Sequence, residues 1–201
     1  MSEYERWEAR FKEPGYHFGT APNAFLKSKA ALFKPGQKVL SIADGEGRNG
    51  VFLAGLRCDV LAIDFSPSAL KKAQALAKDR GVTLRTELAD LETWSWPAAA
   101  FDAIVGIFFQ FLVPASRSRV FGQIKRALKP GGLVLIEGYG LKQLEYKTGG
   151  PGVPDQLYTR ATLQDAFADF ASLEIAEYDA VLSEGDRHVG MSALVDLVGR
   201  K

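Results

Sequence analysis

The stretch VLSIADGEGRNG, residues 39–50, constrains the fold of this chain more than any other feature. An apolar run, Val39 to Ala43, leads into a glycine-rich turn, and a helical pattern starts directly after it. Glycines at positions 45 and 47 allow positive φ angles and a close backbone approach to a ligand. The free N–H groups at the start of the following helix point to the same place. This order of strand, glycine turn and helix predicts a nucleotide-binding loop.

Strand and helix patterns alternate after this loop. We expect strands at residues 38–43, 59–63, 82–88, 101–108 and 133–137, and helices at residues 48–56, 66–80 and 116–128. Apolar strands separated by helices are typical of a parallel sheet that is buried on both faces.

The C-terminal part of the chain has a different pattern. Residues 162–165, Thr-Leu-Gln-Asp, resemble a capping box and predict that a helix begins there. Two β-like runs, residues 172–182 and 191–198, are joined by a short connection, which requires antiparallel strands. The fold class that we expect is therefore α/β: a doubly wound, mostly parallel, seven-stranded Rossmann-like sheet with a C-terminal antiparallel hairpin and helices on both faces.

The length of 201 residues suits a single domain, residues 1–201. Tyr4, Trp7 and Phe11 have helical spacing, and an irregular aromatic segment follows them. We expect residues 1–35 to form an N-terminal helical segment that either covers a pocket as a lid or packs as a plain loop. Residues 36–201 are expected to form the Rossmann-like core.

The charge balance argues against a nucleic-acid partner, because 25 basic and 24 acidic residues give a net charge of only +1. Cys58 is the single cysteine, which excludes an internal disulfide and fits a reducing compartment. The first residues lack the apolar core of a signal peptide, and no apolar run has the length of a membrane span. We expect a cytoplasmic protein without a membrane partner, as a monomer or weak homodimer.

Gly45, Gly47 and Gly50 also spell the G-x-G-x-x-G pattern of dinucleotide-binding proteins, and Asp64 follows at the end of the second strand. A carboxylate at that place can accept hydrogen bonds from both ribose hydroxyls. An NAD-linked reductase is therefore one alternative. It is the minor one, because little chain remains for a substrate-binding part and the final hairpin is foreign to the usual dinucleotide-binding sheet.

Five segments together resemble the class I S-adenosylmethionine-dependent methyltransferases over nearly the whole chain. They are VLSIADGEGRNG, VLAIDFSPSALKKAQ, ELADLETW, FDAIVGIFF and ALKPGGLVLIEGY. Within this class, GEGRN and the upstream YHFGTAPNAFL look like the branch that contains tellurite-resistance and thiopurine methyltransferase-like proteins. The resemblance implies S-adenosylmethionine as cofactor and methyl transfer as activity.

The resemblance also implies roles for residues at the strand ends. Asp64 would hold the ribose hydroxyls, Phe65 would lie against the adenine face, and Asp90 would accept from the adenine amino group. The full expected cofactor-binding set is Ala43, Asp44, Gly45, Glu46, Gly47, Arg48, Asn49, Asp64, Phe65, Asp90, Leu91 and Phe108. Plainer roles compete with these: helix capping for Asp64, core packing for Phe65 and a solvated loop acid for Asp90.

Two positions depart from the usual pattern of this family. Ser41 stands where the family usually has Asp or Glu, and Ala43 stands where it usually has Gly. Asp44 or Glu46 is expected to take over part of the role of the missing acid. The departure keeps a second hypothesis open: a protein that binds S-adenosylmethionine or S-adenosylhomocysteine without catalysis.

The catalytic residues are not defined by the sequence. The methyl group of a sulfonium is already activated, so a soft sulfur, selenium or tellurium nucleophile needs no general base. His17, His188 and Tyr146 are weak candidates for a catalytic role. Neither histidine has cysteines or acids at metal-ligand spacing, so we expect no metal site. The neutral charge and the lack of an added domain favour a small-molecule acceptor.

Overall fold

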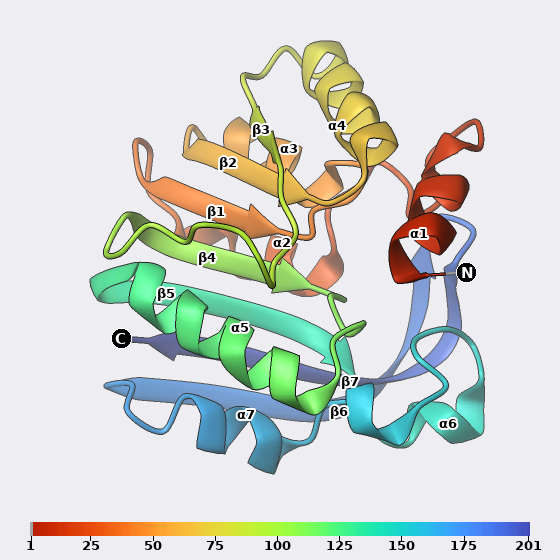
Figure 1. Cartoon of the computed structure of the whole chain (residues 1–201), viewed down its shortest axis with the longest axis vertical. Helices are drawn as coiled ribbons and strands as arrows, with labels where there is room; N and C mark the ends of the chain where they lie inside the picture. Colours follow the sequence, from red (N-terminus) through yellow and green to blue (C-terminus); the bar gives the residue numbers. More distant parts are fainter. Residues whose placement is uncertain (1) are drawn as a thin grey trace. The chain divides into compact units, whose positions relative to one another are not determined.

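The computed structural model describes residues 2–201 and divides into two compact units (Figure 1). Unit 1 runs to Trp94 and includes Glu184–Arg187. Unit 2 comprises Ser95–Ser183 and His188–Lys201. The seven strands follow the order β3-β2-β1-β4-β5-β7-β6 in one mixed sheet.

Unit 1 contains the N-terminal helices and three parallel strands. Its elements are α1 (Glu3–Lys12), α2 (Ala24–Ser28), the 3-10 helix η1 (Ala30–Leu32), β1 (Lys38–Ile42), α3 (Arg48–Gly55), β2 (Asp59–Asp64), α4 (Pro67–Asp79) and β3 (Arg85–Leu88). The strand β2 lies between β1 and β3 and pairs parallel with both, with Leu40 opposite Leu61 and Ile63 opposite Glu87. This arrangement brings the carboxyl ends of β1, β2 and β3 to one edge, where the glycine loop begins.

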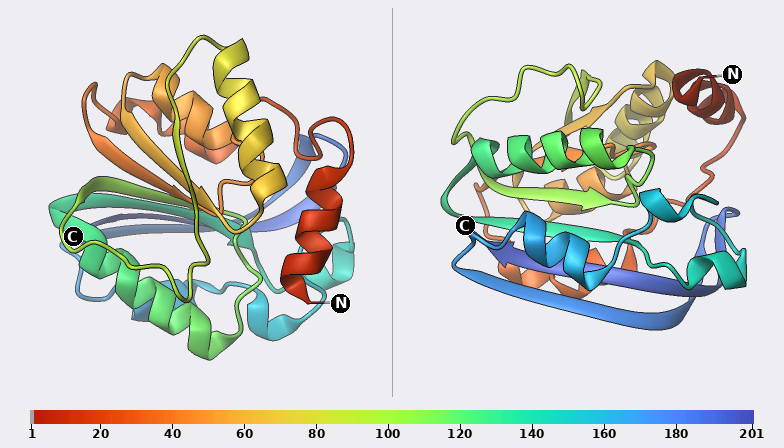
Figure 2. Two further views of the ribbon diagram at one scale, coloured as in Figure 1. Left: turned by 45° about the horizontal axis from the view of Figure 1, so that its top comes forward. Right: turned by 60° about the horizontal axis from the view of Figure 1, so that its bottom comes forward.

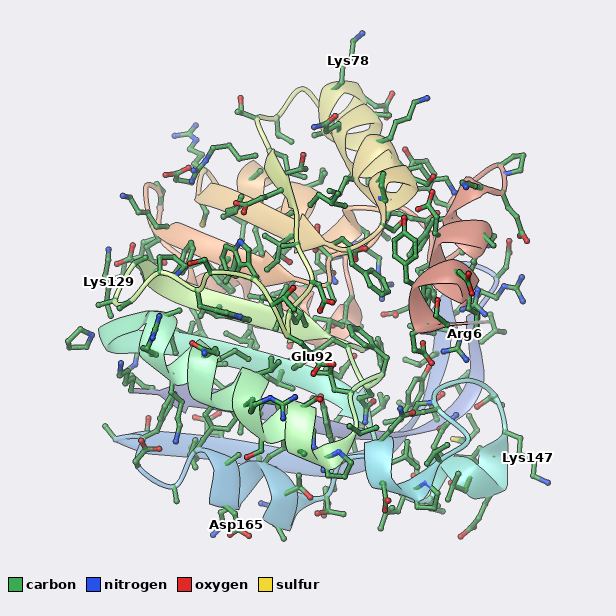
Figure 3. The ribbon with its side chains drawn as sticks, in the orientation of Figure 1. Arg6, Lys78, Glu92, Lys129, Lys147 and Asp165 are labelled. Atoms are coloured by element: carbon green, nitrogen blue, oxygen red, sulfur yellow. The ribbon has the colours of Figure 1, made fainter. Side chains whose placement is uncertain are left out.

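The helix α4 shows how the sequence sets a boundary in unit 1. The hydroxyl of Ser66 accepts a hydrogen bond from the backbone N–H of Ala69, and Pro67 occupies the first turn, as the sequence predicts. The helix packs against β2 and β3 (Figure 1). Lys78, in its last turn, points away from the strands (Figure 3). Val51, Leu76 and Ala77 form a buried cluster between α3 and α4.

Unit 2 contains the rest of the sheet. Its elements are β4 (Phe101–Ile107), α5 (Pro114–Ala127), β5 (Leu128–Tyr139), α6 (Gln143–Tyr146), η2 (Pro154–Gln156), α7 (Arg160–Ala166), β6 (Ser172–Glu184) and β7 (His188–Arg200). The strand β5 pairs parallel with β4 and antiparallel with β7. Figure 2 shows α5 along β4 and β5, and α5 also contacts α7. Tyr139, Leu157, Leu182 and Leu194 form the buried cluster at one end of this unit.

The expected fold class is confirmed: an α/β sheet of seven strands, mostly parallel, that ends in the antiparallel β6–β7 hairpin. Several local boundaries differ from the prediction; for example, β5 begins at Leu128 rather than at residue 133, and β7 at His188 rather than at residue 191. The C-terminal helix begins earlier than expected, because the side chain of Thr159, and not that of Thr162, caps it and accepts from the backbone N–H of Thr162. Within residues 1–35, the segment expected to be helical, the chain after Asn23 is divided at Lys29 into α2 and η1. The third strand begins at Arg85 rather than at Val82.

Candidate functional site

The glycine loop lies in unit 1, between the end of β1 at Ile42 and the start of α3 at Arg48. Gly47 precedes α3 with a φ of 89°, in the left-handed region that favours glycine. A Cβ atom at Gly47 would lie 2.5 Å from the Cβ of Ala73 in α4, so only glycine lets the loop approach this helix. Ala43 also has a positive φ, 46°, at a position where the family usually has glycine.

Asp64 lies at the end of β2 and contacts the glycine loop directly. Its Oδ2 accepts a hydrogen bond from the backbone N–H of Gly45 at 2.9 Å, and its Oδ1 accepts from the backbone N–H of Ser66 at 2.9 Å. The side chain is 4% exposed. Burial raises the pKa of Asp64 to about 6, although the backbone hydrogen bonds lower it. Asp64 therefore contacts the glycine loop and also binds the backbone of Ser66, the capping residue of α4.

Asp44 lies inside the loop. Its Oδ1 accepts from the hydroxyl of Ser41 at 2.6 Å and from the backbone N–H of Gly50 at 3.1 Å. Burial raises the pKa of Asp44 to about 7, against the effect of these hydrogen bonds, and the nearby charge of Asp64 raises it further. Asp44 and Asp64 are thus two buried carboxyl groups at one loop, and both ionise less readily than in water.

The other polar residues of the loop hold neighbouring segments of unit 1. Nζ of Lys72 pairs with Glu46 at 2.8 Å, and the backbone N–H of Phe18 donates to the same carboxylate at 3.3 Å. Arg48 pairs with Glu184, from the tip of the β6–β7 hairpin, at 2.8 Å.

Asn49 makes a further connection of this kind: its Oδ1 accepts from the backbone N–H of Asn23 at 3.0 Å. Arg48 also donates to the carbonyl of Phe18 at 3.2 Å, so Glu46, Arg48 and Asn49 all join the loop to the aromatic segment that follows α1.

The helix α1 covers the loop. A Cβ atom at Gly45 would lie 3.5 Å from the ring of Phe11, so this ring packs against the loop at Gly45. The carboxylate of Glu8 accepts from the hydroxyl of Ser66 at 2.5 Å and from the hydroxyl of Ser68 at 2.7 Å. Sequence analysis missed Glu8; the available signal was an acid on the face of α1 that also carries Phe11. These contacts fix α1 to the start of α4.

The expected adenine-binding residues follow β2 and β3. Phe65 is half-buried, and Tyr4 of α1 meets it edge-on with ring centroids 5.9 Å apart. Asp90 is exposed, and its Oδ1 accepts from the backbone N–H of Glu92 at 2.9 Å. The backbone N–H of Ala89 donates to the carbonyl of Asp64 at 2.9 Å, which sets the start of the Asp90 turn beside the end of β2.

Leu91 follows in the same turn and is buried at 4% exposure. Its side chain therefore belongs to the core of unit 1, and only its backbone remains for the expected role beside Asp90.

Phe108 and His188 both lie in unit 2. Phe108 follows β4 with a φ of 56°, a strained conformation for a bulky residue. Its ring lies 4.7 Å from that of Tyr139 and 4.4 Å from that of His188, centroid to centroid. The three rings form an aromatic group at the end of β4 and β5.

The other two weak catalytic candidates have clear contacts. His17, in unit 1, is buried, and its Nε2 donates to the carbonyl of Arg10 at 2.7 Å. Tyr146, in unit 2, donates from its hydroxyl to Asp179 at 2.8 Å. Both side chains therefore have hydrogen bonds within their own unit.

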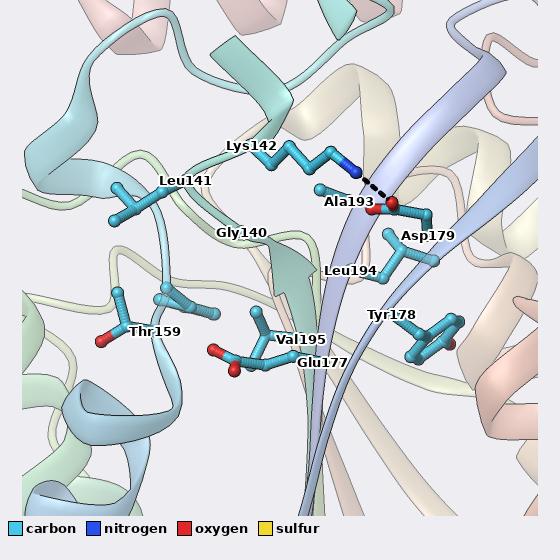
Figure 4. A pocket seen from close by; sticks show the side chains of 11 residues that line it. Gly140, Leu141, Lys142, Thr159, Glu177, Tyr178, Asp179, Ala193, Leu194 and Val195 are labelled. Atoms are coloured by element: carbon cyan, nitrogen blue, oxygen red, sulfur yellow. Dashed lines mark hydrogen bonds and ion pairs between the residues drawn. The ribbon is translucent and has the colours of Figure 1, made fainter. Parts of the chain in front are cut away.

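A separate cavity of about 350 Å³ lies in unit 2, between the end of β5 and the strands β6 and β7 (Figure 4). Both acidic side chains that line it have partners: Asp179 pairs with Lys142, and Glu177 accepts from the backbone N–H of Arg160 at 2.7 Å. None of the residues expected at the cofactor site lines it.

Residues 2–201 hold neither a cluster of metal-binding side chains nor a helix that could span a membrane. In this part of the chain, no three or more His, Cys, Asp or Glu side chains gather in a way that could hold a metal ion. Over the same residues, no helix combines the length and the apolar character that a membrane span requires.

Comparisons with known proteins agree on one class. Residues 39–132 match the family model of the methyltransferase domain. The ribosomal protein L11 methyltransferase of Thermus thermophilus is 34% identical over 130 residues, which cover 63% of this chain and 49% of that protein. The chain spans about half of the length of the curated relatives that it matches.

Solved structures share the fold along nearly the whole chain. A structure concerned with the conversion of a disulfide bond into a thioacetal group during echinomycin biosynthesis superposes with a TM-score of 0.76 at 21% identity, covering 99% of this chain and 91% of the other. TehB from Haemophilus influenzae superposes with a TM-score of 0.70 at 17% identity, covering 98% of this chain and 66% of TehB.

The chain therefore has the fold of the class I S-adenosylmethionine-dependent methyltransferases. Its residues 39–132 match the model of a methyltransferase domain, and solved structures of S-adenosylmethionine-dependent methyltransferases share its fold. The family match and the shared fold support the expected enzyme class and cofactor. The match favours a methyltransferase over the NAD-linked alternative.

Proposed function

We propose that this chain transfers a methyl group from S-adenosylmethionine to a small-molecule acceptor, and that unit 1 binds the cofactor. The observation that carries the proposal is the 2.9 Å hydrogen bond from Gly45 to the buried carboxylate of Asp64. It holds the carboxylate that we propose for ribose binding against the loop that follows β1, at the carboxyl ends of parallel strands, where α/β sheets bind ligands.

The residues of the loop fit a positively charged cofactor. Among the described residues, neither Asp44 nor Asp64 forms an ion pair, and burial raises the pKa of both. A sulfonium and an amino group near these carboxyl groups would favour their ionised forms. The same argument gives Asp44 the role of the acid that the family usually has at position 41, where this chain has Ser41.

We assign roles to the remaining residues by the same resemblance. Phe65 lies against the adenine, Asp90 and the backbone of Leu91 meet its amino group, and Asp64 holds the ribose. The loop residues Ala43, Asp44, Gly45, Glu46, Gly47, Arg48 and Asn49 form the wall beneath the methionine and ribose, while the role of Phe108, which lies in unit 2, stays a prediction from the sequence. Glu46, Arg48 and Asn49 act by ordering the loop, because their side chains already bind the protein.

The acceptor that we favour is a soft nucleophile containing sulfur, selenium or tellurium. When bound, the cofactor supplies an activated methyl group, so the protein has to place the nucleophile in line and exclude water. The hydrogen bond of His17 to the carbonyl of Arg10 occupies Nε2, which leaves only Nδ1 of this ring as a candidate base. The fold likeness to TehB and to the echinomycin structure supports sulfur or tellurium chemistry.

We further propose that the chain acts in the cytoplasm as one methyltransferase domain of the tellurite-resistance and thiopurine methyltransferase-like branch, as a monomer or weak homodimer. Residues 1–35 act as the lid of the cofactor site. The contacts of Phe11 with Gly45 and of Glu8 with Ser66 support this assignment.

The second function that the loop supports is binding of S-adenosylmethionine or S-adenosylhomocysteine without catalysis. The observation in its favour is the engagement of Asp44 by Ser41, which ties the acid of the loop to the protein itself.

Calorimetric titration with S-adenosylmethionine and with S-adenosylhomocysteine, followed by methyl-transfer assays on thiols, selenite with a reductant and tellurite with a reductant, separates these functions. Binding of both ligands with turnover of one acceptor class supports the methyltransferase. Tight binding without turnover of any acceptor supports the binding protein. No binding of either ligand contradicts both.

A further inference from the structure

Three arginines gather in unit 1 where α1 meets the tip of the β6–β7 hairpin. Arg6 and Arg10 lie on successive turns of α1 and flank Trp7, with their guanidinium carbons 5.9 Å and 4.6 Å from the centre of its ring. Figure 3 labels Arg6 on this helix. Stacking on an aromatic face holds a guanidinium in place and leaves its edge free to donate hydrogen bonds.

The third arginine, Arg187, is brought there by backbone contacts of the hairpin tip. The backbone N–H of Asp186 donates to the carbonyl of His17 at 2.9 Å, and a Cβ atom at Gly185 would lie 2.3 Å from the same oxygen. Nε2 of His17 in turn donates to the carbonyl of Arg10 at 2.7 Å. This chain of contacts fixes the tip beside Arg10.

The positive charge of this cluster is not balanced. Arg6 pairs with Glu3 at 2.6 Å, but within residues 2–201 neither Arg10 nor Arg187 has a carboxylate at ion-pair distance. Arg10 is half-buried; burial lowers its pKa, and the charges of Arg187 and Arg6 lower it further, against weaker effects of Glu13 and Glu3. Like charges held together at a partly buried place cost free energy, which a bound anion offsets.

We propose that Arg10 and Arg187 form a binding site for a small oxyanion, that is, for a carboxylate or phosphate-type group on a small molecule. Guanidinium groups donate paired hydrogen bonds in a geometry that matches such oxyanions. The site uses none of the residues assigned to the cofactor, so it adds a second ligand to the proposed function. Its position on α1 makes the N-terminal segment an anion receptor as well as a cover.

Trp7 provides the reporter for a test, because its ring contacts the guanidinium of Arg10. The full chain is titrated with sodium phosphate and, separately, with sodium acetate at constant ionic strength kept with sodium chloride, while tryptophan fluorescence is recorded. Trp7→Phe identifies the part of the signal that comes from this ring. We expect a saturable change with at least one anion, and Arg10→Gln and Arg187→Gln each weaken the affinity at least fivefold.

Arg85→Gln is the matched control, since Arg85 is an exposed arginine of the same unit that pairs with Asp59 at 2.8 Å. The control should bind the anion as the unchanged chain does. Binding of S-adenosylhomocysteine, measured on every variant, reports whether the fold and the cofactor site are intact. Arg187 is exposed, so Arg187→Gln keeps the test decisive even where Arg10→Gln fails to fold.

The ratio of phosphate to acetate affinity distinguishes a phosphate-bearing ligand from a carboxylate-bearing one. Absence of saturable binding of both anions overturns the proposal. Equal affinity in the unchanged chain, Arg10→Gln and Arg187→Gln overturns it as well, whatever the result with S-adenosylhomocysteine.

Discussion

The hydroxyl of Ser41 donates a 2.6 Å hydrogen bond to the carboxyl group of Asp44, three residues further along the chain. The acid that the family usually has at position 41 is thus replaced by a serine that binds an acid of the loop itself. Asp44 also accepts from the backbone N–H of Gly50, at the first turn of α3. The loop therefore keeps a carboxyl group in its interior, at a new position and buried.

The first prediction concerns pH. Burial raises the pKa of Asp44 to about 7, so much of this group is protonated at pH 6 in the free protein. A cationic ligand favours the ionised form, and its affinity should therefore rise, by about tenfold, between pH 6 and pH 8. Calorimetric titration with S-adenosylmethionine across this range measures the effect.

Two variants control this prediction. Asp44→Asn should bind more weakly and lose the pH dependence that comes from this group, while Ser41→Ala should move the dependence to higher pH because a hydrogen bond to the ionised form is lost. If the affinity of Asp44→Asn depends on pH as that of the unchanged chain does, Asp44 is not the group that causes the pH dependence.

The same raised pKa has a consequence for the stability of the free protein. The folded state binds the proton of Asp44 more tightly than the unfolded state does, so this contribution is fully present near pH 4 and is lost as the pH rises through about 7. Asp64, whose burial raises its pKa to about 6, acts in the same direction. Melting temperatures of the cofactor-free chain and of Asp44→Asn, compared from pH 5 to pH 8, should converge at the acidic end.

The second prediction is that Asp64→Ala weakens binding of S-adenosylhomocysteine at least tenfold, since it removes the carboxylate proposed to hold the ribose. Asp64→Asn is the companion variant: it keeps an acceptor for one backbone N–H and should retain more stability than Asp64→Ala. Calorimetry gives the affinity and thermal unfolding gives the stability. Unchanged affinity in both variants would mean that the ribose lies elsewhere.

The sequence predicted the parts of the fold that depend on short-range pattern. The apolar run before Asp64 and the Ser66-Pro67 pair that follows it set the end of β2 and the start of α4, and both were found at the expected residues. The local sequence predicts a helix start less well where two residues could each cap the helix. Thr159 and Thr162 are both residue types that cap helices; Thr159 caps α7, and Thr162 lies within it.

Contacts between distant segments could not be predicted from the sequence. Glu184 reaches Arg48 from the far end of the β6–β7 hairpin, and Glu8 reaches Ser66 from α1. An acid in a turn or on a helix normally indicates a solvated face, so nothing in the local sequence marked Glu184, and the only signal for Glu8 was its place on the face of α1 that carries Phe11. The pairing depends on how the segments pack, which periodicity does not encode.

The third prediction concerns Gly47. Substitution by alanine would bring a Cβ within 2.5 Å of the Cβ of Ala73 and impose a left-handed conformation at a φ of 89°. We expect Gly47→Ala to lower the free energy of unfolding by about 2 kcal/mol or more, together with loss of cofactor binding. Gly55→Ala is the control, because its added Cβ meets no atom within 4 Å and a helix favours alanine. Chemical denaturation of both variants measures the difference.

The last prediction concerns the ion pair that joins the glycine loop to the hairpin tip. Arg48 and Glu184 lie 2.8 Å apart, and their side chains are 7% and 10% exposed. Glu184 also accepts from the side-chain amide of Asn23 at 3.1 Å. Removal of one partner of a buried pair leaves an uncompensated charge, so Glu184→Ala should cost about 3–5 kcal/mol of unfolding free energy.

Replacement of both charged residues tests whether the loss of stability comes from a buried charge that has no partner. The double variant Arg48→Met/Glu184→Leu should recover a large part of this loss, because apolar side chains of similar size often replace a buried pair at little cost. Asp59→Ala, which breaks an exposed pair with Arg85, should cost less than about 1 kcal/mol. If Glu184→Ala is no more damaging than Asp59→Ala in chemical denaturation, the hairpin tip does not hold the loop, and Arg48 is oriented by its hydrogen bond to the carbonyl of Phe18 instead.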